Sequence, residues 1–272
     1  MLNINKFLSI FNLRLIKLPP PHPPTHTTYN SHSNINRINI GSGNWSCNGW
    51  TNLDYPSEWY YKAQKKHEIV PYNIRENNIP YEDNSVDVIY CSHVIEHIEN
   101  EYIHKMFNEC YRVLKKEGII RICCPDAEFL YEVSKYKTDY WQWRKEWFQS
   151  DYYIKTNEPR NIDFLVREIA TPKLLNYKYS INQTDYIQQF NQLDMFSFFD
   201  YLTDDLSYRK EYPGDHINWW TFAKVKNMLF ESGFRCVIRS KWSGSGSKEM
   251  KDIYRFDTTY PLMSLYVEAI KL

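Results

Sequence analysis

The chain has 272 residues, and 33 lysine and arginine residues balance 33 aspartate and glutamate residues. This zero formal charge argues against nucleic-acid binding through broad electrostatics. The length allows one large domain, or a domain with a sizeable insertion, around a full hydrophobic core. Aromatic residues make up 17% of the chain. They suit a surface for a polar, partly apolar ligand such as a sugar, although a codon bias toward Asn, Ile, Lys and Tyr accounts for most of this composition.

The N-terminal region differs from the rest. Residues 1–18 are apolar but interrupted by basic side chains, so they are too short and too charged for a membrane-spanning helix. No small-residue cleavage site follows, which argues against a secretory signal. Two interpretations stay open, a peripheral amphipathic membrane anchor or an element packed on the domain. The proline-rich run 19–24 predicts a linker, so we separate residues 1–33 from a folded domain at 34–272.

Six cysteines occur, and none of them forms a C-x-x-C pair. Cys91, Cys123 and Cys236 fall in apolar, strand-like runs, where a thiol acts as a small core hydrophobe. We therefore expect a reducing compartment, the cytoplasm, and no zinc or other metal site.

The folded domain begins with an apolar strand at 38–40, which breaks into a tight loop carrying Gly41 and Gly43. Glycine lacks a Cβ, so the backbone can turn sharply and lie against a ligand. A second short strand follows at 50–55 and is closed by Asp54. A carboxylate at such a strand tip can accept hydrogen bonds from both hydroxyls of a ribose.

Short apolar strands then alternate with helical patterns. We expect strands at 67–72, 86–91 and 119–124. The repeat of apolar residues predicts a helix at 99–116, whose C-terminal signals include Gly118. Helical crossovers between short apolar strands favour a parallel sheet with helices on both faces.

Residues 127–215 break this rhythm and are rich in aromatic side chains. A structureless loop of this length is implausible, so we expect a helical insertion, with helices at 131–147 and 194–206. We expect a helix at 220–232, capped by Gly233, to restore the rhythm.

Two strands are expected to close the domain. The first lies at 234–242 and the second at 265–272. The run SGSGS at 243–247 has no Lys-Ser/Thr and no strand-to-helix context, so we interpret it as a hairpin connection rather than a phosphate loop.

In order, these motifs resemble those of the class I S-adenosylmethionine-dependent methyltransferases, in particular the small-molecule type 11 group. INIGSG is similar to the first glycine motif of the family, and NLD to its second strand with the ribose-binding acid. IPYEDNSVDVIYCSHVIEHI is similar to the block around the fourth strand, and ECYRVLKKEGIIRICCPD to the helix and fifth strand that follow. The resemblance implies a Rossmann-like, doubly wound α/β fold. Its seven-stranded sheet would be mostly parallel with an antiparallel last strand, and residues 127–215 would be an insertion that caps the substrate.

The resemblance also implies S-adenosyl-L-methionine as the cofactor. The glycine loop would line its methionine and ribose parts, and two residues after the third strand would flank adenine. Position by position, the implied cofactor-binding residues are Asn39, Gly41, Ser42, Gly43, Asp54, Asn73, Ile74, Ser92 and His93. The family usually has acids where Asn39 and Asn73 stand. Losing one charge-assisted hydrogen bond costs on the order of 1.5–3 kcal/mol, which weakens binding without abolishing it.

Methyl transfer is an in-line displacement at a sulfonium carbon, for which the protein supplies position and a dry site. A general base would help an alcohol acceptor. The candidates are His216, Asp126 and Asp215, and for His216 a capping or packing role is an equal alternative. His97 is interpreted mainly as a packing residue and Glu96 as a helix-dipole partner.

We therefore expect methyl transfer to a small-molecule acceptor, with a hydroxyl of a sugar or glycan as the favoured target. This would be O-methylation in glycan biosynthesis, without a nucleic-acid partner. One alternative is N- or C-methylation of a lipid or metabolite. The other is a scaffold that keeps the fold without catalysis.

Overall fold

The computed structural model describes residues 35–58, 60, 64–65, 67–136, 139–145, 159–176, 180–181 and 186–272. Ile35–Leu272 forms one compact unit. The predictions made for residues 1–33 lie outside the described residues and stay predictions. Among the helices that the structure describes, none has both the length and the apolar character that a bilayer crossing requires.

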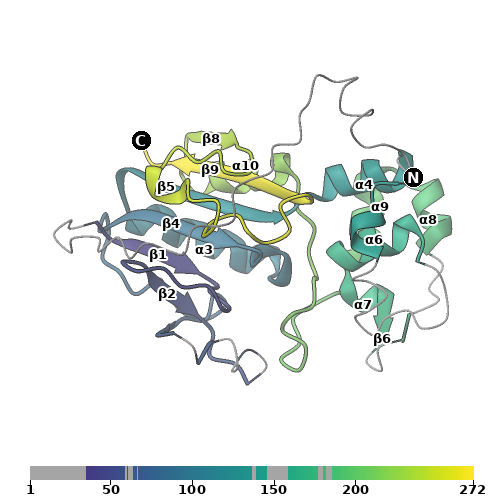
Figure 1. The fold of residues 1–272 in the computed structure, drawn as a ribbon, viewed down its shortest axis with the longest axis horizontal. Coiled ribbons are helices and arrows are strands. Elements are labelled where there is room, and N and C mark those ends of the chain that lie inside the picture. The colour runs from purple at the N-terminus through teal and green to yellow at the C-terminus, as the bar shows by residue number, and fades with distance from the viewer. Residues whose placement is uncertain are drawn as a thin grey trace. The chain divides into compact units, whose positions relative to one another are not determined.

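A seven-stranded sheet forms the centre of the domain (Figure 1). Its strands are β1 (Arg37–Ile40), β2 (Thr51–Asp54), β3 (Val70–Pro71), β4 (Val86–Ser92), β5 (Leu114–Pro125), β8 (Cys236–Arg239) and β9 (Ser264–Ile270). They lie in the order β3-β2-β1-β4-β5-β9-β8. Only β9 runs antiparallel to its neighbours β5 and β8, whereas the other adjacent pairs are parallel. The predicted fold class is therefore confirmed.

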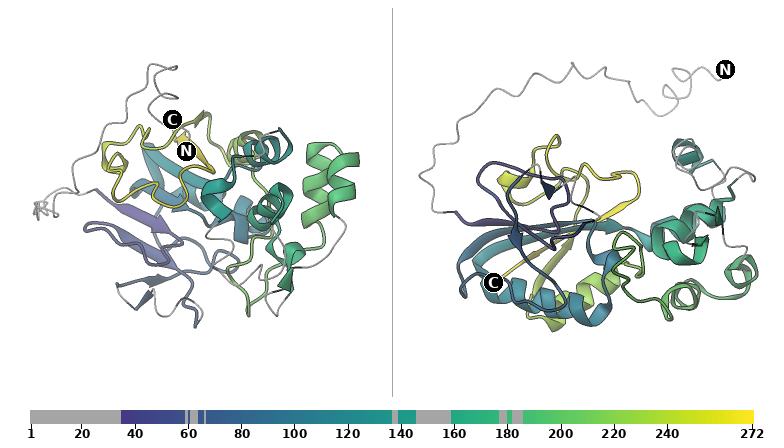
Figure 2. Two further views of the ribbon diagram at one scale, coloured as in Figure 1. Left: turned by 45° about the vertical axis from the view of Figure 1, so that its right-hand side comes forward. Right: turned by 90° about the horizontal axis from the view of Figure 1, so that it is seen from below.

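The two faces of the sheet are covered differently. Helices α3 (Asn100–Val113) and α10 (Phe222–Glu231) pack on one face, where Phe107 and Leu229 are fully buried (Figure 2). On the opposite face, Trp45 and Phe256 pack on Tyr90 of β4 and come from loops rather than from helices. Because β4 and β5 are covered on both faces, they are nearly continuous apolar runs in the sequence.

The helix predicted at 99–116 ends earlier than expected, because Leu114 already pairs with Val86 as the first residue of β5. The role of Gly118 as a helix-ending signal is wrong, since Glu117 adopts the left-handed conformation instead (φ +67°). Gly118 is required for packing. A Cβ there would lie 2.9 Å from the Leu114 side chain and from the Lys115 carbonyl oxygen.

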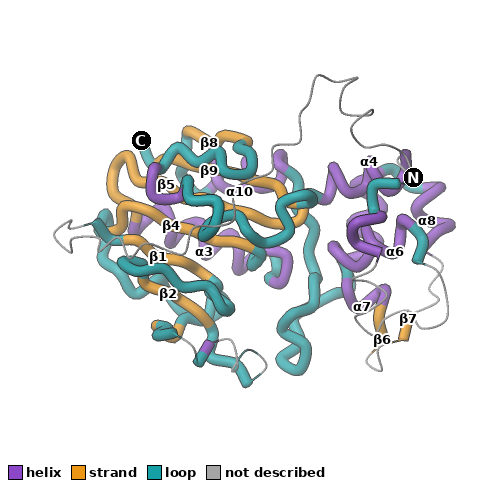
Figure 3. The backbone as a smooth tube through the Cα atoms, viewed as in Figure 1, coloured by secondary structure: helices purple, strands orange, loops and turns teal. Residues whose placement is uncertain are grey.

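The segment between β5 and α10 is largely helical in its described residues, as predicted (Figure 3). Its helices are α4 (Ala127–Tyr136), α6 (Asn161–Ile169), α7 (Thr171–Leu174), α8 (Tyr186–Gln192) and α9 (Met195–Thr203). A separate antiparallel pair, β6 (Leu175–Asn176) and β7 (Ser180–Ile181), was not predicted. The helices bury a core of their own, which includes Trp141, Phe198 and Phe199.

Two helix predictions in this segment differ in outcome. The helix predicted at 194–206 corresponds to α9, and Asp194 caps it by accepting hydrogen bonds from the Phe196 and Ser197 amides. The helix predicted at 131–147 is wrong in extent, because α4 ends at Tyr136 and a turn occupies residues 139–141. The apolar pattern of the sequence continues past this turn, because Trp141 is buried in the same core as the apolar residues of α4.

The end of the chain forms a longer connection than the predicted hairpin. Strands β8 and β9 are antiparallel neighbours as expected, and Gly233 (φ +106°) ends α10. The SGSGS run does not close a hairpin turn. It opens a connection, residues 240–263, that contains the short helix η2 (Lys248–Met250).

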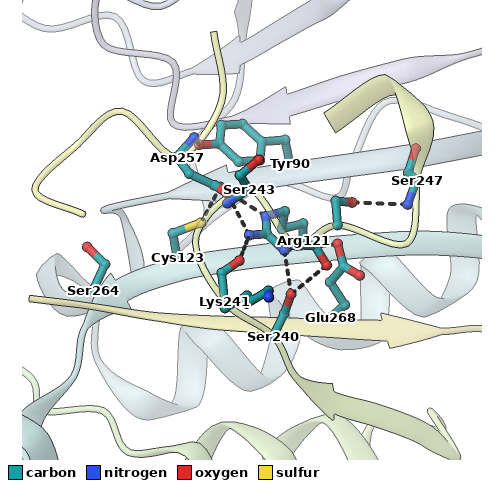
Figure 4. A network of polar contacts seen from close by, with 12 residues as sticks. Tyr90, Arg121, Cys123, Ser240, Lys241, Ser243, Ser247, Asp257, Ser264 and Glu268 are labelled. Atoms are coloured by element: carbon teal, nitrogen blue, oxygen red, sulfur yellow. Dashed lines mark hydrogen bonds and ion pairs between the residues drawn. The ribbon is translucent and has the colours of Figure 1, made fainter. Parts of the chain in front are cut away.

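The connection 240–263 is held on the sheet by Arg121 of β5, whose side chain is fully buried (Figure 4). Arg121 donates two hydrogen bonds to the Asp257 carboxylate, at 2.9 and 2.5 Å, and one to Glu268 at 3.0 Å. Its remaining N–H groups bond to Ser240 Oγ and the Lys241 carbonyl oxygen. All five donors of the guanidinium are therefore satisfied.

Candidate cofactor pocket and active site

Two cavities open at the carboxyl ends of the strands. The first has a volume of about 500 Å³, and the predicted residues Gly41, Gly43, Asp54, Asn73, Ile74 and His93 line it. The second, of about 450 Å³, shares Gly41, Gly43 and His93 with the first and adds the predicted residues Asn39, Ser42 and Ser92. Each of the nine predicted cofactor residues therefore faces one cavity or both. Ligands of open α/β sheets bind at this end of the strands.

The loop after β1 needs its first glycine for two reasons. Gly41 has φ +72°, and a Cβ at this position would lie 2.2 Å from Val94 Cγ2. Gly43 also has a positive φ, of +53°, but the space around its missing Cβ is open. The Gly41 amide donates to the Leu53 carbonyl oxygen at 2.8 Å, which ties the loop to β2.

Asp54 lies at the tip of β2 and holds the glycine loop. Its Oδ2 accepts hydrogen bonds from the Gly43 amide at 2.8 Å and from Ser42 Oγ at 3.0 Å. Its Oδ1 accepts one from the Tyr55 amide at 2.8 Å. A carboxylate has about four acceptor positions, so Oδ1 keeps one for a ligand hydroxyl. The loop and a ribose would thus share one carboxylate.

The two asparagines that stand where the family has acids are engaged locally. Asn39 is buried, and its amide donates to Asn52 Oδ1 at 3.2 Å. Asn73 Oδ1 accepts from the Arg75 amide at 3.1 Å, which closes a turn. The turn uses one lone pair of this oxygen, so Asn73 can offer a ligand the second lone pair as well as the donors of its amide group.

The first predicted base, His216, lines neither cavity. Its Nδ1 lies 2.8 Å from the Glu168 carbonyl oxygen, and its Nε2 lies 3.4 Å from Arg167 Nη1. Burial, together with the positive charges of His97 and Arg167, holds the pKa of His216 well below its usual value. The His216 ring is therefore neutral. It packs edge-on against the ring of His97, with 4.7 Å between the ring centroids, and His97 in turn lines the first cavity.

The two predicted acids also lie outside both cavity linings. Asp126 forms an ion pair with Arg239 at 2.7 Å, and burial raises its pKa. Asp215 pairs with Arg209, and burial raises its pKa as well. The structure places Asp215 beside His97, because the Asp215 carbonyl oxygen accepts from His97 Nδ1 at 2.9 Å. Catalytic roles for these residues stay predictions.

The end of the insertion supplies cavity residues that no sequence motif indicated. Tyr208, Lys210 and Pro213 line the first cavity together with the glycine loop. The Tyr208 amide donates to Glu99 Oε1 at 2.8 Å, and its ring lies 3.8 Å from the Arg75 guanidinium. No spacing rule connects residues so far apart, and the aromatic content of the insertion was the only available signal.

Comparison with known proteins gives one family match and several similar folds. The family model described as a methyltransferase domain matches residues 46–122, from shortly after Gly43 into β5. A SAM-dependent methyltransferase from Archaeoglobus fulgidus is 15% identical, with a TM-score of 0.42 and coverage of 87% of this chain and 86% of that one. One from Mesorhizobium loti is 12% identical, with a TM-score of 0.43 and coverage of 87% and 91%. No curated protein matches the chain. The family match therefore covers residues 46–122, less than a third of the chain, and the sheet has the strand order that the sequence resemblance implied.

Proposed function

We propose that this enzyme transfers the methyl group of S-adenosylmethionine to a hydroxyl of a small polar acceptor of the sugar or glycan class. The observation that carries the proposal is that one cavity joins the cofactor loops to the insertion. Gly41 and Asp54 line it from the sheet, and Tyr208 and Lys210 line it from the segment after α9. Its volume of about 500 Å³ lies within the range of small-molecule sites.

The lining of this cavity favours a hydroxylated acceptor. Four of its residues are tyrosines, namely Tyr55, Tyr60, Tyr72 and Tyr208. A tyrosine presents a flat apolar face and a polar tip, which match the C–H faces and hydroxyls of a sugar. Burial raises the pKa of Tyr60 to about 12. The hydroxyl of Tyr72 is buried, so it is the ring of Tyr72 that lines the cavity.

In this proposal the ribose lies at Asp54 and adenine lies between Asn73 and Ile74. The methionine tail follows the glycine loop toward the second cavity, which shares Gly41 and Gly43 with the first. The acceptor occupies the end of the first cavity near Tyr208. Alignment of the two reactants inside such a site can supply roughly 7–11 kcal/mol of the barrier reduction.

Calorimetric titration with S-adenosylmethionine tests the cofactor part. We expect wild-type protein to bind it and Asp54→Asn to bind it roughly 10- to 150-fold more weakly, because one charge-assisted contact is lost. Asp83→Asn is the matched control, since it removes an exposed carboxylate that pairs with Arg112. Failure of the wild type to bind at millimolar cofactor would support the scaffold alternative instead.

The acceptor class needs a second assay. Formation of S-adenosylhomocysteine is measured with panels of sugars, sugar nucleotides, amines and lipids, and products are analysed for methyl ethers by mass spectrometry. Turnover with hydroxylated acceptors supports the proposal. Turnover only with amines or carbon acids would overturn the O-methyl assignment while leaving the cofactor assignment intact.

A further inference from the structure

Three side chains of the types that bind metal ions lie close together beside the first cavity. One ligand atom each from Glu96, His97 and His216 lies within 4.8 Å of the other two. Glu96 and His97 belong to the short helix η1 (Ile95–His97) that follows β4. His216 comes from the end of the insertion, where the amides of Ile217 and Asn218 donate to the Glu96 carbonyl oxygen at 2.9 and 3.1 Å. Backbone hydrogen bonds thus hold the two halves of the cluster together.

The Glu96 carboxylate is left short of partners. It is 1% exposed, and its Oε2 has no hydrogen-bond partner among the described residues. Its nearest basic side chain is that of His93, whose Nδ1 lies 3.1 Å from Oε1. An ionised carboxylate buried in this way costs several kcal/mol unless a cation approaches it.

The two imidazoles are oriented as metal ligands are. Nδ1 of His97 lies 2.9 Å from the Asp215 carbonyl oxygen, and Nδ1 of His216 lies 2.8 Å from the Glu168 carbonyl oxygen. A carbonyl oxygen only accepts, so each Nδ1 carries a proton, and Nε2 is the nitrogen of each ring that is left to bind a metal. Metal-binding histidines typically have this outer hydrogen bond, which sets the tautomer and the ring orientation.

We propose that Glu96, His97 and His216 bind one divalent first-row transition-metal ion. Two imidazoles and one carboxylate suit Zn²⁺, Mn²⁺ or Fe²⁺, whereas Mg²⁺ and Ca²⁺ prefer oxygen ligands throughout. Ligand atoms around one such ion are at most about 4 Å apart, so binding draws the three side chains together slightly. The expectation that the chain lacks a metal site came from the cysteine pattern, and none of these three ligands is a cysteine.

Arg167 opposes the cation. Its Nη1 lies 3.4 Å from His216 Nε2, the atom that would bind the metal. The same guanidinium nitrogen lies 3.3 Å from Glu168 Oε2, so Arg167 keeps an anionic partner when the metal displaces it. Removing this positive charge should therefore strengthen metal binding.

The catalytic use of the ion rests on the proposed function. With three protein ligands, an open coordination position can take the acceptor hydroxyl, and His97 places the ion at the wall of the first cavity. The ion lowers the pKa of the bound hydroxyl, whose proton passes to water. The resulting oxygen forms its bond to the methyl carbon while the C–S electron pair stays on sulfur, which leaves a neutral thioether. This would activate an alcohol although none of the predicted bases lines a cavity.

The site is tested by titrating chelator-treated full-length protein with ZnCl₂, MnCl₂ or MgCl₂ alone in a calorimeter. We expect one Zn²⁺ or Mn²⁺ per chain and weaker binding of Mg²⁺. Glu96→Gln and His216→Gln should each weaken binding at least tenfold, and Arg167→Met should strengthen it. His104→Gln on α3 is the matched control, because its half-exposed ring lies outside the cluster. Binding that is absent, or undiminished in both ligand variants, would overturn the proposal.

Two further measurements keep the outcome clear. Co²⁺ added to wild-type protein should give the absorption bands of an ion with nitrogen ligands, which needs no variant to fold, and a spectrum of purely aqueous Co²⁺ would contradict the site. Cofactor titration and acceptor turnover are repeated in excess chelator. Cofactor binding with turnover that is lost in chelator and restored by Zn²⁺ or Mn²⁺ supports the site. Turnover that is unchanged in excess chelator would overturn the proposed metal site without affecting the proposed methyl transfer.

Discussion

Two buried clusters of charged side chains lie beside the central sheet, and they differ in how many of their polar atoms have hydrogen-bond partners. Arg121, Asp257 and Glu268 form one, in which every N–H of the guanidinium has an acceptor (Figure 4). Glu96 and its two histidines form the other, in which a buried carboxylate oxygen has no hydrogen-bond partner among the described residues. A complete network of polar groups rigidifies a structure, whereas an incomplete one is costly unless a ligand completes it. The comparison therefore separates a structural cluster from a candidate site.

Each cluster also joins the sheet to a distant part of the chain. Arg121 holds the connection 240–263, whose Arg255 and Thr259 line the second cavity. The Glu96 cluster holds the end of the insertion, whose Tyr208 lines the first cavity. In the Arg121 cluster, the hydrogen-bonding groups of the guanidinium all have partners. In the Glu96 cluster, a bound metal ion would supply the missing partner. The following predictions test this difference in order of decreasing effect.

The largest effect is expected from Arg121→Ala, because it leaves two carboxylates buried in the core without their positive partner. Breaking a buried ion pair from one side typically costs about 3–5 kcal/mol. Urea unfolding followed by circular dichroism should show a loss of this size. Asp205→Asn, at an exposed ion pair with Lys173, should stay within about 0.5 kcal/mol of wild type. If Arg121→Ala lowered the free energy of unfolding by less than about 1 kcal/mol, the Arg121 cluster would not be a main structural support of the fold.

Asp257→Asn should have an intermediate effect. Asparagine keeps the shape of the side chain and tolerates the positive φ of +57° at this position. The charge is lost and one of the two accepting oxygens becomes a donating amide that faces N–H groups, so we expect a destabilisation of about 1.5–3 kcal/mol in the same urea experiment. Hydrogen exchange of residues 240–263 should increase together with it. Unchanged exchange there would show that Arg121 does not anchor this connection.

The Glu96 cluster should make the stability depend on pH. His216 stays neutral in the folded chain, because burial holds its pKa well below the usual value, while the unfolded chain takes up a proton below about pH 6.5. The unfolded state then binds more protons, so the free energy of unfolding rises with pH up to about 6.5 and levels off above it. This histidine contributes at most about 1.4 kcal/mol per pH unit.

Chelated protein provides the measurement for this pH dependence, with urea midpoints determined between pH 5 and pH 8. The charged groups around His216 are His97 and Glu96 on η1 and Arg167 and Glu168 on α6. His216→Asn should flatten the slope below pH 6.5. An equal slope in this variant would assign the titration to one of these neighbours.

The smallest effect on the metal-free protein is expected for Glu96→Gln. The change removes the cost of burying a charge together with the favourable contact to His93 at 3.1 Å, so the two terms nearly cancel to within about 1 kcal/mol. With Zn²⁺ at 100 times its dissociation constant, wild-type protein should gain about 2.7 kcal/mol, and a variant that binds at least tenfold more weakly should gain at most about 1.4 kcal/mol. Thermal unfolding with and without Zn²⁺ measures both numbers, and an equal gain in both proteins would count against the site.

The sequence by itself determined the features that depend on neighbouring residues. The apolar run of β4, the glycine loop at Gly41 and the carboxylate at Asp54 follow from backbone conformation and from strand ends, and all three lie where the sequence predicted. Fold class follows from the order of such local signals. This is why the residues at the strand ends could be placed from the sequence, whereas their binding of a cofactor stays a prediction.

Only the tertiary structure decided which distant residues meet. The sequence indicates a helix-dipole partner at Glu96, a packing residue at His97, and either a base or a packing residue at His216, because spacing contains no information about how the insertion returns to the sheet. The backbone hydrogen bonds from Ile217 and Asn218 to Glu96 make that return. Arg121 likewise looks like an isolated charge in an apolar strand until Asp257 and Glu268 are brought to it. Long-range pairing depends on the path of the whole chain, so the two buried clusters could be found only in the folded protein.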